Sequence, residues 1–268
     1  MLRPIIPLLL LALTSTLLQA QPDSPTAANT TPRLVIAYET NHNPPRALGS
    51  GTSINWEKPG LTLELLEKVK KALGIEIEYK RMPWKRGLYL LERSEIDGLF
   101  HASYKPEREQ LGEYPQHDGR PDESRAIFIQ SYALYKLKGS SPEYDGQSIR
   151  HLDGPIGVVS GYSIESQLKS QGYDISAAHS MQSNFDRLNK GRIVAFAMLE
   201  NMADDFLQRN RDLYASIEKV TPVLQARAYY LLLSKRMKQS HPELSESIWN
   251  AVRDINQSAS FQNLANHY

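Results

Sequence analysis

The sequence predicts an α/β fold built on a mostly parallel sheet, and three observations lead to that prediction. Segments rich in β-branched and aromatic residues alternate with segments that have the apolar spacing of amphipathic helices. Strands that alternate with helices form βαβ units, whose strands run parallel. Polar or glycine-containing turns follow several apolar strands, at the strand ends where open α/β sheets bind ligands. The 268 residues suffice for one large domain or two small ones.

The first βαβ unit is predicted within residues 33–79. Residues 33–38 form an apolar strand, and residues 39–53 form a polar loop. Residues 61–73 carry leucine or valine at every fourth position, which predicts an amphipathic helix with Gly74 at its C-terminal end. Apolar and acidic residues then alternate over 75–79, which is typical of a strand with one solvated face.

The stretch from Trp84 to Arg108 is predicted to form a helix, a buried strand and a loop that ends in an arginine. His101 and Ser103 stand at the end of the strand, which begins at Leu99, and Arg108 follows five residues after Ser103. A guanidinium group holds a carboxylate with two parallel hydrogen bonds, so this stretch suits one wall of a binding site. The alternative is that Arg108 is a solvated residue at a helix start.

A second candidate site follows the apolar strand predicted over residues 156–159. The turn contains Gly161, Tyr162 and Ser163, and Ser163 is predicted to be the N-cap of the next helix. A strand, a glycine turn and a helix N-terminus together suit an anion, because free backbone N–H groups point at the ligand. An ordinary capped helix is the alternative.

The remaining elements continue the alternation. Residues 126–137 and 228–233 favour strands, and Ser183 with Asp186 has the spacing of a capping box. The strand predicted over residues 193–199 ends at Glu200, which is suited either to an ammonium group or to capping the next helix. The last helix is predicted to start near Pro242.

The N-terminus predicts export from the cytoplasm. Residues 1–20 have one basic residue, Arg3, before an apolar run that ends at Ala20, as in a cleavable signal peptide. Residues 21–32 are rich in Pro, Thr, Ala and Ser and are predicted to be a disordered leader. The chain has no cysteine, so neither a lipoprotein nor a disulfide is expected. These features predict a soluble protein of the bacterial periplasm.

Charge and motifs exclude several classes of function. Arg3 is the only charged residue of the signal segment, so the remaining chain would carry 30 acidic residues and equally many basic ones. That balance favours neither nucleic acid nor a membrane surface as a partner. No P-loop, dinucleotide glycine fingerprint, HExxH or GxSxG is present, and the seven histidines have no metal-ligand spacing. No catalytic residue, cofactor or metal site is predicted.

Six segments, in their order and spacing, resemble the type II periplasmic solute-binding proteins, in the polar-amino-acid branch that serves ABC importers. The resemblance covers residues 33–268 and rests on NPP at 43–45, GLTLELLEKVKKALG at 60–74, EIDGLFHASYKPER at 95–108, IGVVSGYS at 156–163, LNKGRIVAFAMLE at 188–200 and LLLSKRMKQSHPEL at 231–244.

The resemblance implies a two-lobed periplasmic-binding-protein-like fold. Each lobe has a mostly parallel sheet flanked by helices, and two crossover strands near residues 127–131 and 224–226 join the lobes around a ligand cleft. Lobe one would then comprise residues 33–129 and 226–268, and lobe two would comprise residues 130–225.

The resemblance also implies ligand-binding residues. Arg108 corresponds to the arginine that holds the ligand α-carboxylate. His101 and Ser103 correspond to small residues at the strand end, and Gly161, Tyr162 and Ser163 correspond to a carboxylate-binding turn. The family's second-lobe aspartate, which holds an α-ammonium group, falls on Leu199, with Glu200 one residue later.

Two further positions depart from the family pattern. Lys105 replaces a threonine of the arginine segment, and Arg46 replaces the aromatic residue that usually follows the proline pair. Trp84 or Tyr38 is expected to supply the missing aromatic wall.

The function implied is that of a monomeric binding protein, which captures an amino acid or related carboxylate and presents it to an ABC transporter permease. A periplasmic sensor that passes its signal to a membrane receptor is one alternative. A cyclohexadienyl dehydratase-like enzyme on the same fold is another, and Glu39, His101 and Glu200 are its candidate general acids.

Overall fold

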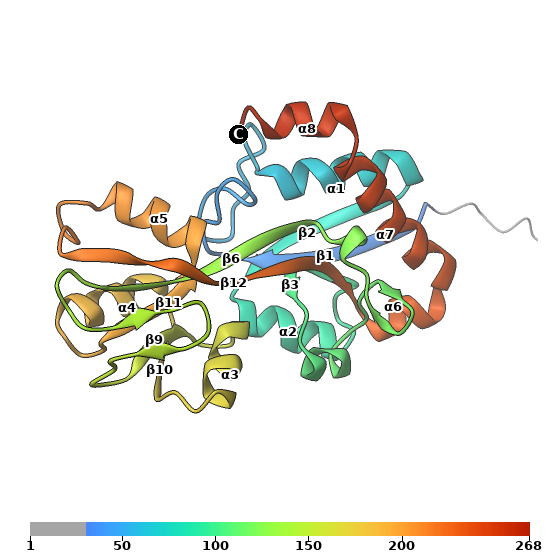
Figure 1. The fold of residues 1–268 in the computed structure, drawn as a ribbon. Helices are drawn as coiled ribbons and strands as arrows, with labels where there is room; N and C mark the ends of the chain where they lie inside the picture. Colours follow the sequence, from blue (N-terminus) through green and yellow to red (C-terminus); the bar gives the residue numbers. More distant parts are fainter. Residues whose placement is uncertain (1–30) are drawn as a thin grey trace, which may run out of the picture. The chain divides into compact units, whose positions relative to one another are not determined.

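The computed structural model describes residues 31–268 (Figure 1). The predicted signal peptide and the leader up to residue 30 lie outside the described residues. Among the helices that are described, none has the length and apolar character needed to cross a membrane.

Eight strands form one mixed sheet in the order β10-β9-β11-β6-β12-β3-β1-β2. The pairs β10–β9, β9–β11, β1–β3 and β1–β2 are parallel, and the three pairs that involve β6 or β12 are antiparallel. The α/β prediction is therefore confirmed. The strands are β1 (Arg33–Glu39), β2 (Glu76–Met82), β3 (Gly98–Ser103), β6 (Phe128–Leu137), β9 (Ile156–Val159), β10 (Ile175–Ala178), β11 (Ala195–Leu199) and β12 (Ile217–Leu233).

The helices divide between the two ends of this sheet (Figure 1). The β1 half consists of β1–β3 with α1 (Leu61–Leu73), α2 (Trp84–Glu92), the short helices η1 (Pro106–Gln110) and η2 (Glu123–Arg125), α6 (Lys235–Ser240), α7 (Pro242–Asn256) and α8 (Ala259–Ala265). The β9 half consists of β9–β11 with α3 (Ser163–Ser170), α4 (Met181–Asn189) and α5 (Glu200–Arg209). Two small ribbons, β4–β5 (Gln116–His117 and Arg120–Pro121) and β7–β8 (Glu143–Tyr144 and Ile149–Arg150), lie outside the sheet.

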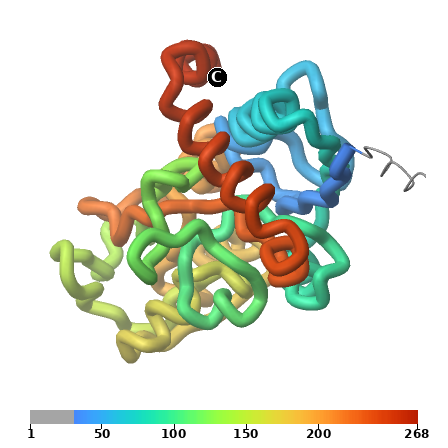
Figure 2. Tube along the Cα trace, turned by 90° about the vertical axis from the view of Figure 1, so that its right-hand side faces the viewer, coloured from blue at the N-terminus to red at the C-terminus, as the bar shows by residue number. Residues whose placement is uncertain are grey.

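The apolar pattern explains how the helices cover the sheet. The leucines of α1 are buried, and Gly74 ends the helix in the left-handed region with φ 61°, as predicted. The helix α7 packs against α1, whereas α2 lies on the opposite side of the sheet (Figures 1 and 2). A further helix, α8, follows α7, so the helix that begins at Pro242 is not the last one.

The long strands β6 and β12 connect the two halves. Ser131 lies opposite Ala226 in their antiparallel ladder, so the two crossings predicted from the sequence run side by side. The register shifts between Val220 and Gln225, where β12 has four intervening residues against a single residue of β6. The division into two lobes at residues 129 and 225 stays a prediction.

The predicted capping box at Ser183 and Asp186 is wrong by three residues. Ser180 is the N-cap of α4, and its Oγ accepts a hydrogen bond from the backbone N–H of Ser183 at 3.1 Å. Asp186 lies inside the helix and accepts a hydrogen bond from the hydroxyl of Tyr214 instead. The helix begins earlier than the spacing predicted, so Ser183 is its third residue and Asp186 lies in its second turn.

Candidate ligand-binding site

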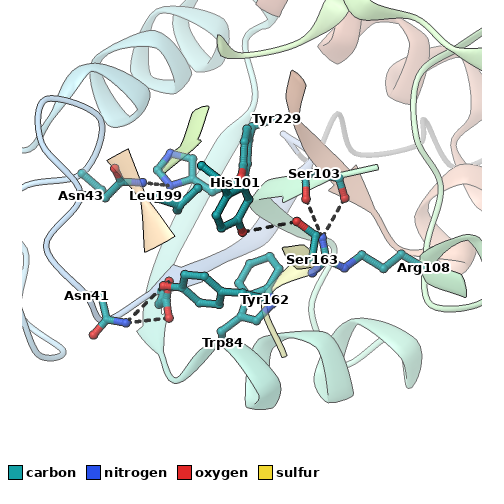
Figure 3. A pocket seen from close by; sticks show the side chains of 13 residues that line it. Asn41, Asn43, Trp84, His101, Ser103, Arg108, Tyr162, Ser163, Leu199 and Tyr229 are labelled. Atoms are coloured by element: carbon teal, nitrogen blue, oxygen red, sulfur yellow. Dashed lines mark hydrogen bonds between the residues drawn. The ribbon is translucent and has the colours of Figure 1, made fainter. Parts of the chain in front are cut away.

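A cavity lies between the two halves and is lined by 13 residues (Figure 3). The volume that the centres of water molecules can occupy in this cavity is about 30 Å³. The cavity therefore has room for two or three waters. Seven of the nine residues predicted from the sequence line the cavity, namely Glu39, Trp84, His101, Ser103, Arg108, Tyr162 and Ser163. The cavity therefore brings together residues from β1, α2, β3, η1 and the start of α3.

Arg108 is 5 % exposed and has no acidic partner among the described residues. Its Nη1 donates to the backbone oxygen of Ser103 at 2.7 Å and to Ser103 Oγ at 3.2 Å. Its Nη2 donates across the cavity to the backbone oxygen of Gly161 at 3.2 Å. A buried cation that is bound only by neutral groups has uncompensated charge, which a carboxylate is suited to neutralise.

Trp84 forms an aromatic wall beside this arginine. The Arg108 guanidinium lies 5.3 Å from the centroid of the Trp84 ring, in cation–π geometry. Trp84 is 7 % exposed, and its indole Nε1 is buried without a hydrogen-bond partner among the described residues. The residue that begins α2 is thus both packed into the β1 half and part of the cavity lining.

The turn before α3 faces Arg108 from the β9 half. Gly161 has φ 84°, a left-handed conformation that glycine adopts without strain, and its N–H donates to the carboxylate of Glu165 at 2.7 Å. The backbone N–H groups of Ser163 and Ile164 donate no hydrogen bond within residues 31–268. These two groups remain available for an anion at the helix N-terminus.

The prediction that Ser163 is the N-cap of α3 is wrong. Tyr162 occupies the N-cap position and makes no capping hydrogen bond with its side chain. Ser163 is the first helical residue, and its Oγ lies 3.3 Å from the Tyr132 hydroxyl on the cavity side. The Glu165 carboxylate accepts a hydrogen bond from the N–H of Gly161, the residue before the N-cap, so the first N–H groups of the helix stay without a cap.

His101 sits at a bulge of β3. Phe100 and Ala102 pair with consecutive residues of β12, which leaves His101 without a partner and with φ 68°. A positive φ is strained for a residue with a Cβ, and such strain is concentrated at functional sites. The bulge directs the imidazole between the rings of Phe100 and Phe128, at centroid distances of 4.6 and 4.9 Å.

The hydrogen bonds of His101 indicate which ring nitrogen carries the proton of the neutral imidazole. The amide nitrogen of Asn43, 3.5 Å from Nδ1, can only donate, so the ring proton lies on Nε2 and is donated to Thr62 Oγ1 at 2.9 Å. Burial, with a smaller contribution from the charge of Arg46, lowers the pKa of His101 to about 3. The imidazole is therefore uncharged at neutral pH and acts as a polar but neutral wall.

Glu39, at the end of β1, is the acidic residue of the cavity. Its carboxyl oxygens accept hydrogen bonds from Tyr162 Oη at 2.6 Å and from Asn41 Nδ2 at 2.8 Å. Burial raises the pKa of Glu39 to about 7, although these two hydrogen bonds and the charge of Arg81 act in the opposite direction. The carboxyl group therefore changes its charge near neutral pH.

Glu200 does not line this cavity. It begins α5 and its carboxylate pairs with Lys219 at 2.9 Å, whereas Leu199 contributes an apolar side chain to the cavity. Neighbouring residues at a strand end point in different directions, so an offset of one position removes the side chain from the site. Gly161 contributes through its carbonyl contact with Arg108.

The prediction missed four polar residues of the cavity: Asn41, Asn43, Tyr132 and Tyr229. The two asparagines belong to a polar loop in which no pattern singles out an inward-facing side chain. The two tyrosines lie on the crossing strands β6 and β12, where their aromatic character indicates a strand and does not indicate a cavity. Within residues 31–268, no cluster of three or more His, Asp or Glu side chains is placed to hold a metal ion.

Solved structures with the same fold place this architecture among two-lobed binding proteins. An ancestral arginine-binding protein bound to glutamine has 18% identity and a TM-score of 0.66, over 89% of this chain and 98% of that one. A histidine kinase sensor domain similar to periplasmic binding proteins has 13% identity and a TM-score of 0.70, over 89% and 96%. An arginine-, lysine- and histidine-binding protein from Geobacillus stearothermophilus has 16% identity and a TM-score of 0.67, over 88% and 94%.

Sequence comparisons give the family. A comparison with curated proteins finds no significant match. The model of the bacterial extracellular solute-binding proteins, family 3, matches residues 34–268, which is nearly all of the described chain. This match agrees with the resemblance found in the sequence and with the shared fold. The chain therefore belongs to the bacterial extracellular solute-binding proteins, family 3.

Proposed function

We propose that this protein is a periplasmic binding protein that captures an amino acid or a related small carboxylate between its two halves. The observation that carries the proposal is Arg108, which is buried at the cavity and has only neutral partners among the described residues. The ligand carboxylate would bind the guanidinium and the free N–H groups of Ser163 and Ile164.

The opposite end of the cavity favours a hydrogen-bond donor on the ligand. Asn41, whose amide donates to Glu39, lies across the cavity from Arg108 (Figure 3). Glu39 would accept from an ammonium or hydroxyl group, since Leu199 provides no acceptor side chain where the family has an aspartate. The ring of Trp84 would cover the carbon atoms between the two polar ends.

Ligand entry requires the halves to separate, because the cavity has room for only a few waters. Contacts between the halves include Arg108 to Gly161, and Tyr162 to Glu39 and Asn41. They also include Asn201 to Asn43 and to the carbonyl of Pro44, and His42 Nε2 to Asp205 Oδ2 at 3.7 Å. Opening and closing would follow a hinge in β6 and β12, and the closed form would be presented to an ABC importer.

A periplasmic sensor is the second candidate. The similar fold of a histidine kinase sensor domain supports that alternative. Transport predicts that deleting the gene abolishes uptake of the ligand, whereas sensing predicts normal uptake and a lost transcriptional or signalling response to it.

An enzyme on this fold is the third candidate, and the pKa of about 7 for Glu39 supports it, because a general acid needs a pKa near the working pH. Incubation of the purified protein with prephenate or arogenate would reveal a dehydratase through release of carbon dioxide. Unchanged substrate after prolonged incubation would exclude that activity.

The decisive test of binding is a thermal-shift screen of amino acids, opines, polyamines and small organic acids. A ligand at 100 times its Kd adds about 2.7 kcal/mol to the free energy of unfolding, which raises the melting temperature measurably. The same screen with Arg108→Ala should show no shift with the hit. If the hit stabilises both proteins equally, Arg108 is not the anchor.

A further inference from the structure

The size of the cavity restricts the ligands that it can hold. The centres of water molecules can occupy about 30 Å³ of it, which corresponds to two or three waters. Since each water in the liquid takes up ~30 Å³, the closed halves leave room for ~60–90 Å³ of ligand. That is about the bulk of glycine, alanine or lactate, and it is too little for arginine, glutamine or an opine.

The walls of the cavity are large side chains that are held in place by other contacts. The ring of Tyr229 stacks on Phe128 with 5.2 Å between the centroids, and the hydroxyl of Tyr132 lies 3.3 Å from Ser163 Oγ. Leu199 lies opposite Tyr132 in the ladder of β11 and β6. None of the side chains of Tyr132, Leu199 and Tyr229 is more than 5 % exposed. A longer ligand would therefore displace packed side chains or keep the halves apart.

A ligand that keeps the halves apart loses contacts that join them. Tyr162 donates to Glu39 at 2.6 Å, and Asn201 donates to Asn43 Oδ1 at 2.8 Å. Both hydrogen bonds span the two halves, so they are lost together when the halves separate. A short ligand lets both of them form, and the closed form therefore favours short ligands.

The charge of the cavity restricts the ligand in a second, independent way. Among the described residues that line the cavity, only Arg108 and Glu39 carry a charge near neutral pH, because His101 is neutral there. One carboxylate on the ligand neutralises Arg108, and one hydrogen-bond donor binds Glu39. A second cation on the ligand would be buried without a partner, and a second carboxylate would be repelled by the carboxyl group of Glu39.

We propose, on the basis of the function proposed above, that the cavity selects a short-chain monocarboxylate with one amino or hydroxyl group and no charged side chain, such as glycine, alanine, serine or lactate. Arg108 holds the carboxylate, and Glu39 accepts from the amino or hydroxyl group. Leu199 limits the length of the chain, because its apolar side chain closes the cavity from the end of β11. Basic and dicarboxylic amino acids are then poor ligands, although they carry the same α-carboxylate.

The limit on length is tested by calorimetry of the wild-type protein at constant ionic strength. Glycine, alanine, norvaline and norleucine increase in chain length and do not differ in charge. We expect Kd values of ~1–100 μM for glycine or alanine. Norvaline and norleucine should bind at least about tenfold more weakly than alanine, because an overpacked site forces side chains out of place. Lactate, compared with alanine, shows whether the hydroxyl or the amino group is preferred.

The limit on charge is tested with two ligands of nearly the same size. Diaminopropionate carries one positive charge more than serine at about pH 6, because both of its amino groups are then mostly protonated. It should bind at least about thirtyfold more weakly than serine, since the cavity offers no partner for the second ammonium group. Arginine should bind more weakly still, because it is both too long and too highly charged.

Variants locate the limit on length. Leu199→Ala removes part of the wall, so the Kd of norvaline should come within a few-fold of that of alanine. Leu213→Ala, at an exposed leucine outside the cavity, is the matched control and should leave the order of affinities unchanged. The ligand series on the wild-type protein tests the proposal even if Leu199→Ala does not fold.

The proposal is overturned if norvaline, arginine or diaminopropionate binds the wild type as tightly as alanine does. If such binding is lost in Arg108→Ala, the function proposed for the cavity still stands and only the restriction to short ligands fails. If no carboxylate of these series or of the thermal-shift screen binds, the proposed function fails together with the restriction.

Discussion

The hydroxyl of Tyr162 donates a hydrogen bond to the carboxyl group of Glu39, with 2.6 Å between Tyr162 Oη and Glu39 Oε2. The two residues come from opposite halves of the protein, since Glu39 ends β1 and Tyr162 precedes α3. Both residues line the cavity, so the bond joins the two halves there. Burial raises the pKa of this carboxyl group to about 7, although the hydrogen bond from Tyr162 acts in the opposite direction.

Glu39 should make the protein less stable as the pH rises to neutrality. Its pKa is raised from 4.5 to about 7, so between these values the folded protein binds more protons than the unfolded chain. The free energy of unfolding of the wild type, relative to Glu39→Gln, should therefore fall as the pH rises from about 4.5 to about 7 and then level off. Urea unfolding of both proteins over this pH range measures the difference between their free energies of unfolding. A constant difference would contradict the raised pKa.

His101 should have the opposite effect. Its pKa is lowered from 6.5 to about 3, so the folded protein binds fewer protons than the unfolded chain between these values. The stability of the wild type relative to His101→Asn should fall as the pH decreases from about 6.5 towards about 3. Asparagine is chosen because it tolerates the positive φ at this position. NMR titration of the imidazole gives an independent check, and a pKa near 6.5 would refute the prediction.

Arg108→Ala and Arg108→Lys should both lose the ligand. Removal of one member of a buried charge pair costs ~2–5 kcal/mol of binding free energy, and lysine cannot replace the bidentate fork. The loss of fold stability in Arg108→Ala should be only about 1–2 kcal/mol, because the carbonyl of Ser103 keeps a hydrogen bond from the Tyr114 hydroxyl at 2.9 Å. Calorimetry with the screened ligand and urea unfolding separate the two effects.

Trp84→Phe tests whether the indole Nε1, which is buried without a partner among the described residues, contributes to ligand binding. Trp84→Ala is expected to destabilise the ligand-free protein by ~3–5 kcal/mol, since the ring is almost fully buried. Trp84→Phe keeps an aromatic ring and removes Nε1, so the free energy of unfolding should change much less than in Trp84→Ala. The affinity for the ligand should fall about fivefold, which corresponds to the loss of one hydrogen bond. Tyr89→Ala, at an exposed ring of the same helix, serves as the control. Unchanged affinity in Trp84→Phe would show that Nε1 does not meet the ligand.

Asn201→Ala should shift the protein towards an open form. The amide of Asn201 donates to Asn43 Oδ1 at 2.8 Å and to the carbonyl of Pro44, and both contacts join α5 to the β1 half. We expect a larger radius of gyration in small-angle scattering and ligand affinity reduced in proportion to the lost closed population. Asn189→Ala is the control, because Asn189 bonds to Leu213 and Ser216, away from the β1 half. Equal scattering from the wild type and Asn201→Ala would exclude a role in closure.

The sequence by itself determined most of the main strands and helices, but not β10, α6 or α8, and it determined most of one wall of the cavity. Hydrophobic periodicity is a local property, so α1 with its end at Gly74, the strand that carries Ser103, and the glycine turn at residue 161 follow from nearby residues alone. Arg108 could be predicted to bind a ligand because it follows the end of β3 at Ser103 closely and because a guanidinium group is suited to a carboxylate.

Only the tertiary structure decided which side chains share the cavity and in which charge state. A one-residue offset separates Leu199 from Glu200, and the pairing of β11 with β6 decided which of them faces inward. The bulge that turns His101 inward depends on the register of β3 with β12, which no local pattern encodes. The pKa of Glu39 depends on burial by residues far away in the chain. Burial arises from long-range packing, so it can be known only once the fold is known.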